Sequence, residues 1–388
     1  MNSKHKRRTF KITLNSKMLL LMGVAAGCLL LSEMHAGDNL VAAQGSGQSA
    51  DPLIAAQSQS TSVTSNLVEL KANGKKAAQQ GMLFENKTWV PLTFLRDELN
   101  LSLTYESASR TYIITQDYQK LKVTLYEGGV TSYLNGHYLG TPGAKLIKGR
   151  IYVPFQWLKD YLGYEGVWDG KLKQLDIVKS QLNNLEMKTV SHREDNADAV
   201  ITLNAPSVAI PGNTSAEKAI NRVLEKDNSE FQAYIAESLK NREGESNLAP
   251  YEFNSSYVVT YNQKGLLSLF IDKYEYTGGA HGMTVRQGYT FNLEDGSLLT
   301  LKELFGDTSD YMNIINGEIK EGFESHPGYF GGFKGIGSDY TDYYLQIDKV
   351  TFFFQVYEYT PYAAGIPEYS IAYEKLLKKN SHYQNLLP

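Results

Sequence analysis

Two apolar runs in the last third of the chain each end in a short segment rich in glycine, proline and tyrosine. The first run, Leu266 to Ile271, leads into Tyr274–Gly282, and the second, Val350 to Val356, leads into Tyr357–Tyr369. Short apolar runs bounded by such residues predict strands that end in tightly turned loops. Loops carried on a sheet are common binding sites, so both segments are candidates for function. The alternative is that both are structural hairpin ends.

The same half of the chain mixes hairpin patterns with two amphipathic helices. Thr214 and Glu217 have the spacing of a capping box, which predicts a helix start there, and an apolar stripe at helical spacing follows. A second helix is predicted over residues 309–323. The other predicted elements are a polar link at 182–195, a strand at 198–209, hairpins at 257–274 and 287–301, and a last strand at 368–373.

An internal repeat occupies the first half of the chain. Residues 89–99 return as residues 152–162 with a constant offset of 63, and in each copy a strand runs into a proline and then a leucine-rich segment. Proline suits the first position of a helix. Asn73-Gly74 and Asn135-Gly136 are typical hairpin turns. Each copy is therefore predicted to form two strands, a short helix and a closing hairpin, and the copies to pack together over residues 67–180.

The N-terminus combines a basic head with an apolar run. Six Lys or Arg residues precede the run 18–31, and small residues follow it. As a helix, the run spans about 21 Å, against about 30 Å for a hydrocarbon core. A signal peptide over residues 1–43, cut after Ala43, is therefore favoured over a retained anchor. An uncut signal would be the expected membrane contact. Polar residues 44–66 are predicted to be a flexible linker.

The composition shows an excess of acidic residues and predicts that the mature chain has no cysteine. Apolar residues make up 42% and charged residues 21% of the chain, as in folded soluble proteins. The single cysteine, Cys28, lies in the predicted signal, so no disulfide is expected in the mature chain. Loss of residues 1–43 removes six basic and two acidic residues, which changes the formal charge from −4 to −8. This excess of acid argues against nucleic acid as a partner and favours a basic one.

Candidate catalytic groups are few. The sequence has no Gly-x-Ser-x-Gly, His-Glu-x-x-His or phosphate-loop motif, and no histidine pair at metal-binding spacing. We therefore predict no catalytic residue, metal or cofactor. His281 is the best candidate for chemistry, as a general base with Asp272 or Glu275. The alternative is a hydrogen bond that fixes its own loop. His137 is expected to lie on the surface.

Aromatic side chains in the predicted loops favour binding. Tyrosine offers a large contact area at a small entropy cost. The alternative is that half or more of these rings fill the core, since Tyr often buries its ring. Other aromatics in the glycine-rich loop 329–340 include Tyr329, Phe330 and Phe333. The predicted ligand-binding residues are Tyr276, Thr277, Gly278, Gly279, His281, Tyr359, Pro361 and Tyr362.

Residues 67–180 resemble a known domain. Their order of strand, Val-Pro, helix, Leu-Gly, Trp-Asp and strand is similar to the stalk-type domain of Gram-positive surface proteins, often labelled copper amine oxidase N-terminal-like. The resemblance implies a stalk and no oxidase, because copper does not bind in this domain of the family. The chain also shows no His-x-His ligand pattern.

Residues 185–388 resemble the extracellular domain shared by lysozyme-sensing anti-sigma factors and some peptidoglycan deacetylases of Gram-positive bacteria. The resemblance rests on residues 276–282, 296–305 and 357–365. In the anti-sigma relatives this domain binds lysozyme, and in the deacetylases it accompanies a separate catalytic domain. In this sequence 17 residues precede the apolar run, and the metal motifs of the deacetylase domain are not seen. We therefore do not expect anti-sigma activity.

Together these patterns predict an α+β protein: a two-repeat ββαββ-type stalk, then a second α+β domain with a mainly antiparallel sheet and two helices. We expect a secreted protein of a Gram-positive cell envelope. Its expected function is non-enzymatic binding of a protein such as lysozyme or another muramidase, by two C-terminal loops that meet at one edge. Three alternatives stay open: binding of cell-wall glycan, hydrolysis or deacetylation of peptidoglycan through His281, and a passive spacer in which neither half binds anything specific.

Overall fold

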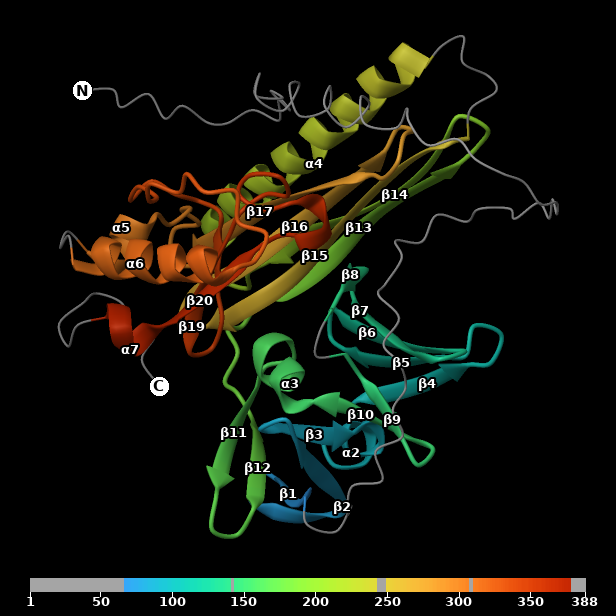
Figure 1. Cartoon of the computed structure of the whole chain (residues 1–388), viewed down its shortest axis with the longest axis vertical. Helices are drawn as coiled ribbons and strands as arrows, with labels where there is room; N and C mark the ends of the chain where they lie inside the picture. The colour runs from blue at the N-terminus through green and yellow to red at the C-terminus, as the bar shows by residue number, and fades with distance from the viewer. Residues whose placement is uncertain (1–65, 141–142, 243–248, 307–309, 378–388) are drawn as a thin grey trace, which may run out of the picture.

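The computed structural model describes residues 66–140, 143–242, 249–306 and 310–377. The predicted signal peptide and nearly all of the predicted linker lie outside these residues. Figure 1 shows the stalk domain in blue to green and the second domain in light green to red. The fold is mixed α+β with mostly antiparallel sheets, which confirms the predicted class. Within the described ranges, no helix has the length and apolar character needed to cross a membrane.

Two sheets and two short helices build the stalk. Its elements are β1 (Leu67–Ala72), β2 (Lys75–Phe84), β3 (Lys87–Pro91), α2 (Leu92–Asp97), β4 (Ser102–Glu106), β5 (Thr111–Gln116), β6 (Gln119–Tyr126), β7 (Gly129–Leu134), β8 (His137–Tyr138), β9 (Lys145–Ile147), β10 (Arg150–Pro154), α3 (Phe155–Tyr161), β11 (Tyr164–Asp169) and β12 (Gln174–Lys179). The strand orders are β11-β12-β1-β2-β3-β10-β9 and β4-β5-β6-β7-β8.

The two copies of the repeat interlock. Val90 of β3 pairs with Val153 of β10, and these two valines are equivalent under the 63-residue offset. The closing hairpin of the second copy also pairs with the first copy, through parallel β12 and β1. Pro91 and Pro154 cap α2 and α3 in extended conformation, one position before the predicted one, because strand pairing holds them extended.

The second domain contains a long five-stranded sheet, a small three-stranded sheet and helices around them. Its elements are β13 (Glu186–Asp195), β14 (Ala199–Ala209), α4 (Thr214–Arg242), β15 (Tyr251–Gln263), β16 (Leu266–Tyr276), β17 (Met283–Asn292), α5 (Leu301–Phe305), α6 (Asp310–Ser325), β18 (Tyr343–Leu345), β19 (Lys349–Phe353), the 3-10 helix η2 (Tyr362–Ala364), β20 (Glu368–Ala372) and α7 (Tyr373–Leu376). The large sheet runs β13-β14-β15-β16-β17, and Figure 1 shows α4 along it.

Three local predictions for this domain need correction. The polar segment expected to link the domains instead forms the edge strand β13, whose side chains are nearly all exposed. Helix α4 begins where predicted, but the side chain of Asn213, not Thr214, accepts from the backbone N–H of Ala216 at 3.2 Å. The short helices α5 and α7 are additional, since elements of five and four residues give no readable period.

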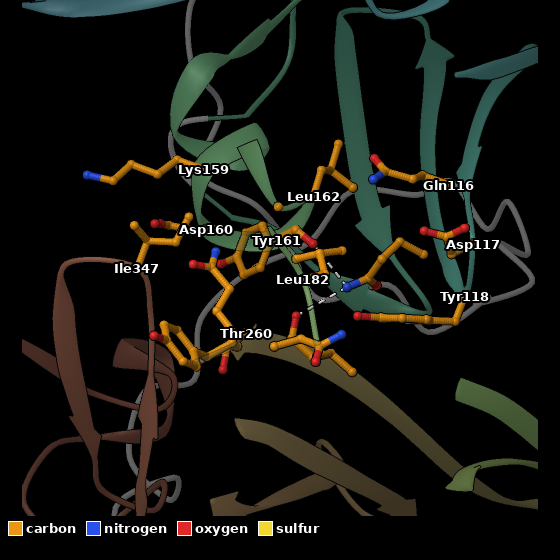
Figure 2. A pocket seen from close by; sticks show the side chains of 16 residues that line it. Gln116, Asp117, Tyr118, Lys159, Asp160, Tyr161, Leu162, Leu182, Thr260 and Ile347 are labelled. Carbon is orange, nitrogen blue, oxygen red and sulfur yellow. Dashed lines mark hydrogen bonds between the residues drawn. The ribbon is translucent and has the colours of Figure 1, made fainter. Parts of the chain in front are cut away.

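Buried side chains run without a break from the stalk into the second domain. Val258, Phe270 and Phe353 of the second domain belong to the same core as Leu121 and Trp157 of the stalk. A small cavity of about 30 Å³ lies at this joint, between the end of α3 and strand β15 (Figure 2).

Polar contacts also cross this joint. The Gln119 amide donates to the carbonyls of Tyr161 and Val259, both at 3.1 Å. Lys159 of α3 pairs with Asp348 at 2.5 Å. The stalk and the second domain therefore pack as a continuous unit.

Candidate functional site

The two predicted loops meet. Residues 277–282 join β16 to β17, and residues 354–367, which include η2, join β19 to β20. The His281 ring stacks on the Tyr362 ring with centroids 3.8 Å apart and planes at 15°. His281 Nε2 lies 3.0 Å from the Tyr357 hydroxyl. We call His281, Tyr357 and Tyr362 the aromatic patch.

The local backbone explains why the first loop needs its glycines. Gly278 and Gly279 have φ of +98° and +95°, which side-chain-bearing residues rarely adopt. Gly282 is required for a different reason. A Cβ there would lie 2.4 Å from the Glu275 carbonyl oxygen and from the ring of Tyr274. These three glycines let the loop fold back and place His281 against the second loop.

Tyr357 is the patch residue that was missing from the predicted set. It has φ of +66°, a conformation uncommon for a bulky residue. Such strained residues gather at functional sites when the surroundings hold them. Its position directly after an apolar strand was visible in the sequence, but its backbone conformation and its contact with His281 were not.

The patch is accessible at its centre and supported at its edges. His281 is exposed with Thr277, Gly278 and Gly279, while the rings of Tyr357 and Tyr362 are half-buried. Burial, and then the neighbouring Tyr357 phenol, raises the pKa of Tyr362, so its hydroxyl stays protonated at neutral pH. Tyr276, the last residue of β16, is half-buried, and its hydroxyl donates to the Gly279 carbonyl at 3.0 Å.

Tyr359, a predicted ligand-binding residue, lies in a different environment. Its half-buried ring packs against the core beside α6, with ring centroids 4.9 Å from Phe323 and 5.4 Å from Phe354. Tyr329 and Phe333 pack on the same Phe323 ring. These three loop aromatics therefore pack against the core, as in the alternative interpretation. Tyr359 does so because the chain between Tyr357 and Tyr362 turns its ring inward.

Two other loop residues, one in the second loop and one in the glycine-rich loop beside it, stay at least partly exposed. Pro361 is half-buried, and a Cβ on Gly328 would lie 3.0 Å from its ring. Phe330 is 57% exposed, and its backbone N–H donates to the Tyr359 carbonyl at 2.9 Å. The glycine-rich loop therefore borders the second loop.

The proposed general-base pairs of His281 do not form. His281 Nδ1 donates to the Gly282 carbonyl at 2.9 Å, so in the neutral ring Nε2 accepts from the Tyr357 hydroxyl. Glu275 points to the other face of the sheet, where Tyr234 donates to its carboxylate. Asp272 is bonded to Arg286. The contacts of His281 instead fix its own loop, which was the alternative interpretation.

A buried charge cluster lies beneath the patch. Arg286 is 5% exposed and donates to Asp272 through Nε at 2.6 Å and Nη2 at 2.9 Å, and to Glu368 through Nη1. Burial opposes ionisation of Asp272, but Arg286 outweighs it and holds the carboxyl pKa far below its usual range. Likewise, burial disfavours the Arg286 charge, yet the Asp272 carboxylate raises the guanidinium pKa.

The prediction that His137 lies on the open surface is wrong, because His137 belongs to this cluster. Its Nδ1 donates to Asp272 Oδ2 at 2.8 Å, and its side chain is 17% exposed. The sequence hid this contact, because it joins residues 135 positions apart. Among the described residues, no group of three or more His, Cys, Asp or Glu side chains is arranged to hold a metal ion.

Comparison with protein families shows the predicted architecture. Residues 69–177 match the copper amine oxidase N-terminal domain. Residues 193–284 match the domain of the deacetylase PdaC, and residues 302–374 match the protein family of unknown function DUF3298. The predicted order of a stalk-like domain and a domain shared with deacetylases and anti-sigma factors is confirmed.

Two curated relatives come from Bacillus subtilis. The chain is 25% identical over 137 residues to the peptidoglycan-N-acetylmuramic acid deacetylase PdaC, covering 35% of this chain and 27% of the relative. It is 27% identical over 192 residues to the anti-sigma-V factor RsiV, covering 46% of this chain and 65% of the relative. The chain thus spans less than two thirds of either relative.

A solved structure is similar to part of the chain. It is a member of the DUF3298 family from Bacteroides fragilis, with a TM-score of 0.42 and 22% identity, over 52% of this chain and 96% of that one.

Proposed function

We propose that this protein is a non-enzymatic binding protein of the cell envelope, which takes a basic protein ligand such as a lysozyme-like muramidase at the aromatic patch. The observation that carries the proposal is the stacking of His281 on Tyr362, which joins two loops from different sheets. A patch of rings held by strained backbone offers contact area with little entropy left to lose on binding.

Charge supports a basic ligand. Residues 274–282 and 355–369 contain three glutamates and neither Lys nor Arg. The predicted mature chain has a formal charge of −8. Nothing in the two loops repels a basic partner, and the net charge accelerates its encounter with the patch. Similarity to an anti-sigma factor and to a peptidoglycan deacetylase supports an envelope location.

Calorimetry of the full mature chain against egg-white lysozyme tests the proposal. We expect measurable binding that weakens with added salt, and a loss of at least about tenfold in affinity for Tyr362→Ala and for His281→Ala. Tyr126→Ala is the matched control, since Tyr126 is 48% exposed on the stalk. Absence of heat with the unmodified chain, or an equal loss in the control, would contradict the proposal.

Glycan binding and catalysis, two of the alternatives, have separate readouts. Co-sedimentation with insoluble peptidoglycan, lost in Tyr362→Ala while lysozyme gives no heat, would make the ligand a glycan. Release of muropeptides or acetate that disappears in His281→Ala would make the protein an enzyme. In that case His281 would need a proton acceptor other than the two carboxylates considered above.

A further inference from the structure

Arg286 connects every strand that carries the aromatic patch. It follows the first loop by four residues, on β17, and its guanidinium forms two parallel hydrogen bonds with Asp272 on β16. The planar fork of Arg fixes the angle as well as the distance of such a pair. The guanidinium also lies 4.0 Å from the Phe270 ring centroid, so it cannot swing aside.

The same residue holds both flanks of the second loop. The Gln355 side chain accepts from the Arg286 backbone N–H at 3.0 Å and donates to its carbonyl at 2.8 Å. Gln355 stands two positions before Tyr357. On the other flank, Glu368 accepts from Arg286 Nη1. One residue therefore fixes the strand before the first loop and both ends of the second.

The stalk completes this cluster. His137 is the first residue of β8 and donates to the same Asp272 carboxylate that Arg286 binds. Its ring meets Phe270 edge-on, with centroids 5.0 Å apart. Figure 1 shows β8 at the end of the stalk that faces the second domain. Arg286 therefore faces the carboxylates of Asp272 and Glu368 within its own domain, and the imidazole of His137 across the joint.

We infer that Arg286 is a positioning residue for the aromatic patch, and that the stalk takes part in the positioning through His137. The stalk is then a component of the binding site and not only a spacer. The reason is geometric: Asp272 lies four residues from Tyr276, about 13 Å along β16. A shift of Asp272 therefore displaces the strand end from which His281 is presented. The biological consequence rests on the proposed function, but the positioning itself does not.

The experiment reads the patch without a ligand. NMR of histidine-labelled full mature chain reports the His281 ring, whose protons are shifted by the stacked Tyr362 ring; His281→Ala assigns them. Hydrogen exchange measured by mass spectrometry reports the amides of residues 277–282 and 357–365. The variants are His137→Ala and Arg286→Lys, which keeps the charge and loses the fork. The control is His192→Ala, whose side chain is 55% exposed on β13.

In both variants we expect the His281 signals to move toward positions typical of an unstacked ring, and the loop amides to exchange about tenfold faster, as loss of a hydrogen bond to a charged group allows. The control should leave both unchanged. Unmoved His281 signals and unchanged loop exchange in a folded His137→Ala protein would overturn the inference, even if its melting temperature falls.

If Arg286→Lys does not fold, the His281 signals and loop exchange of His137→Ala alone test the inference. Binding of lysozyme is measured separately. Displaced His281 signals without any lysozyme binding would leave the positioning role standing and remove the proposed function. Lysozyme binding with unchanged His281 signals in both variants would leave the proposed function standing and remove the positioning role.

Discussion

Two aromatic clusters lie side by side in the second domain and share one short segment. Tyr357 and Tyr362 belong to the aromatic patch, while Tyr359 between them belongs to the cluster around Phe323. Phe323 is fully buried and meets five rings, those of Tyr329, Phe333, Phe354, Tyr359 and Tyr369. The rings of the patch meet one another and lie outside the hydrophobic cores of the described chain.

The difference separates stability from function within a few residues. Rings around Phe323 lose water and gain neighbours, which stabilises the fold. In the patch, the strained φ of Tyr357 acts against stability. Backbone strain that does not serve folding is typical of sites that must keep one geometry. Residue type alone does not distinguish the two clusters; the neighbours of each ring do.

The largest expected effect is on the buried cluster. Phe323→Ala should lower the free energy of unfolding by about 4 kcal/mol, because it leaves a cavity where five rings meet. Urea unfolding monitored by circular dichroism measures it. Phe330→Ala is the control, since Phe330 is 57% exposed, and it should change stability by less than about 0.5 kcal/mol. Equal losses of stability in the two variants would show that the buried ring contacts of Phe323 do not stabilise the fold.

The support beneath the patch is tested by Asp272→Asn. The folded-state pKa of Asp272 lies below its ordinary value of 3.8, since Arg286 outweighs the effect of burial. Ionised Asp272 therefore stabilises the fold above about pH 4, and this stabilisation disappears as the pH falls toward the folded-state pKa. At pH 7 the variant should lose about 3 kcal/mol, because Arg286 loses a buried partner.

Urea unfolding of both proteins between pH 7 and pH 3 checks the sign. The difference in the free energy of unfolding between the unmodified protein and Asp272→Asn should become smaller below about pH 4. Asp195→Asn, with the Asp195 side chain 61% exposed, should give a small gap at every pH. A gap that widens in acid would show that Asp272 is not the ionised partner of Arg286.

The sequence predicted more of the fold than of the site. The repeat, the glycine-bent loop and the second loop are encoded locally by proline, glycine and strand periodicity, which act over a few residues. The meeting of His281 with Tyr362 agrees with the expectation that the loops converge. The direction of Tyr359 was beyond such patterns, because irregular backbone has no period that assigns a face.

Contacts between distant segments were hidden in the same way. His137 looked like a surface histidine on a hairpin turn, yet it reaches a carboxylate of the other domain. Arg286 looked like one of the many charges along a strand pattern, and only the packed structure places it between two carboxylates. A buried charge is recognised by its partners, and the partners of Arg286 come from three separate parts of the chain.

The smallest effect comes from the sharpest comparison, a pair of tyrosines three residues apart. Tyr359→Ala should cost about 2 kcal/mol of stability, because its half-buried ring supports Phe323 and Phe354. Tyr362→Ala should cost about 1 kcal/mol, the value of one stacked pair. Lysozyme affinity should rank them in the opposite order, with the larger loss for Tyr362→Ala. If Tyr359→Ala instead weakens binding more at temperatures where both variants are fully folded, the binding surface extends over the Phe323 cluster, and the division between the two clusters is misplaced.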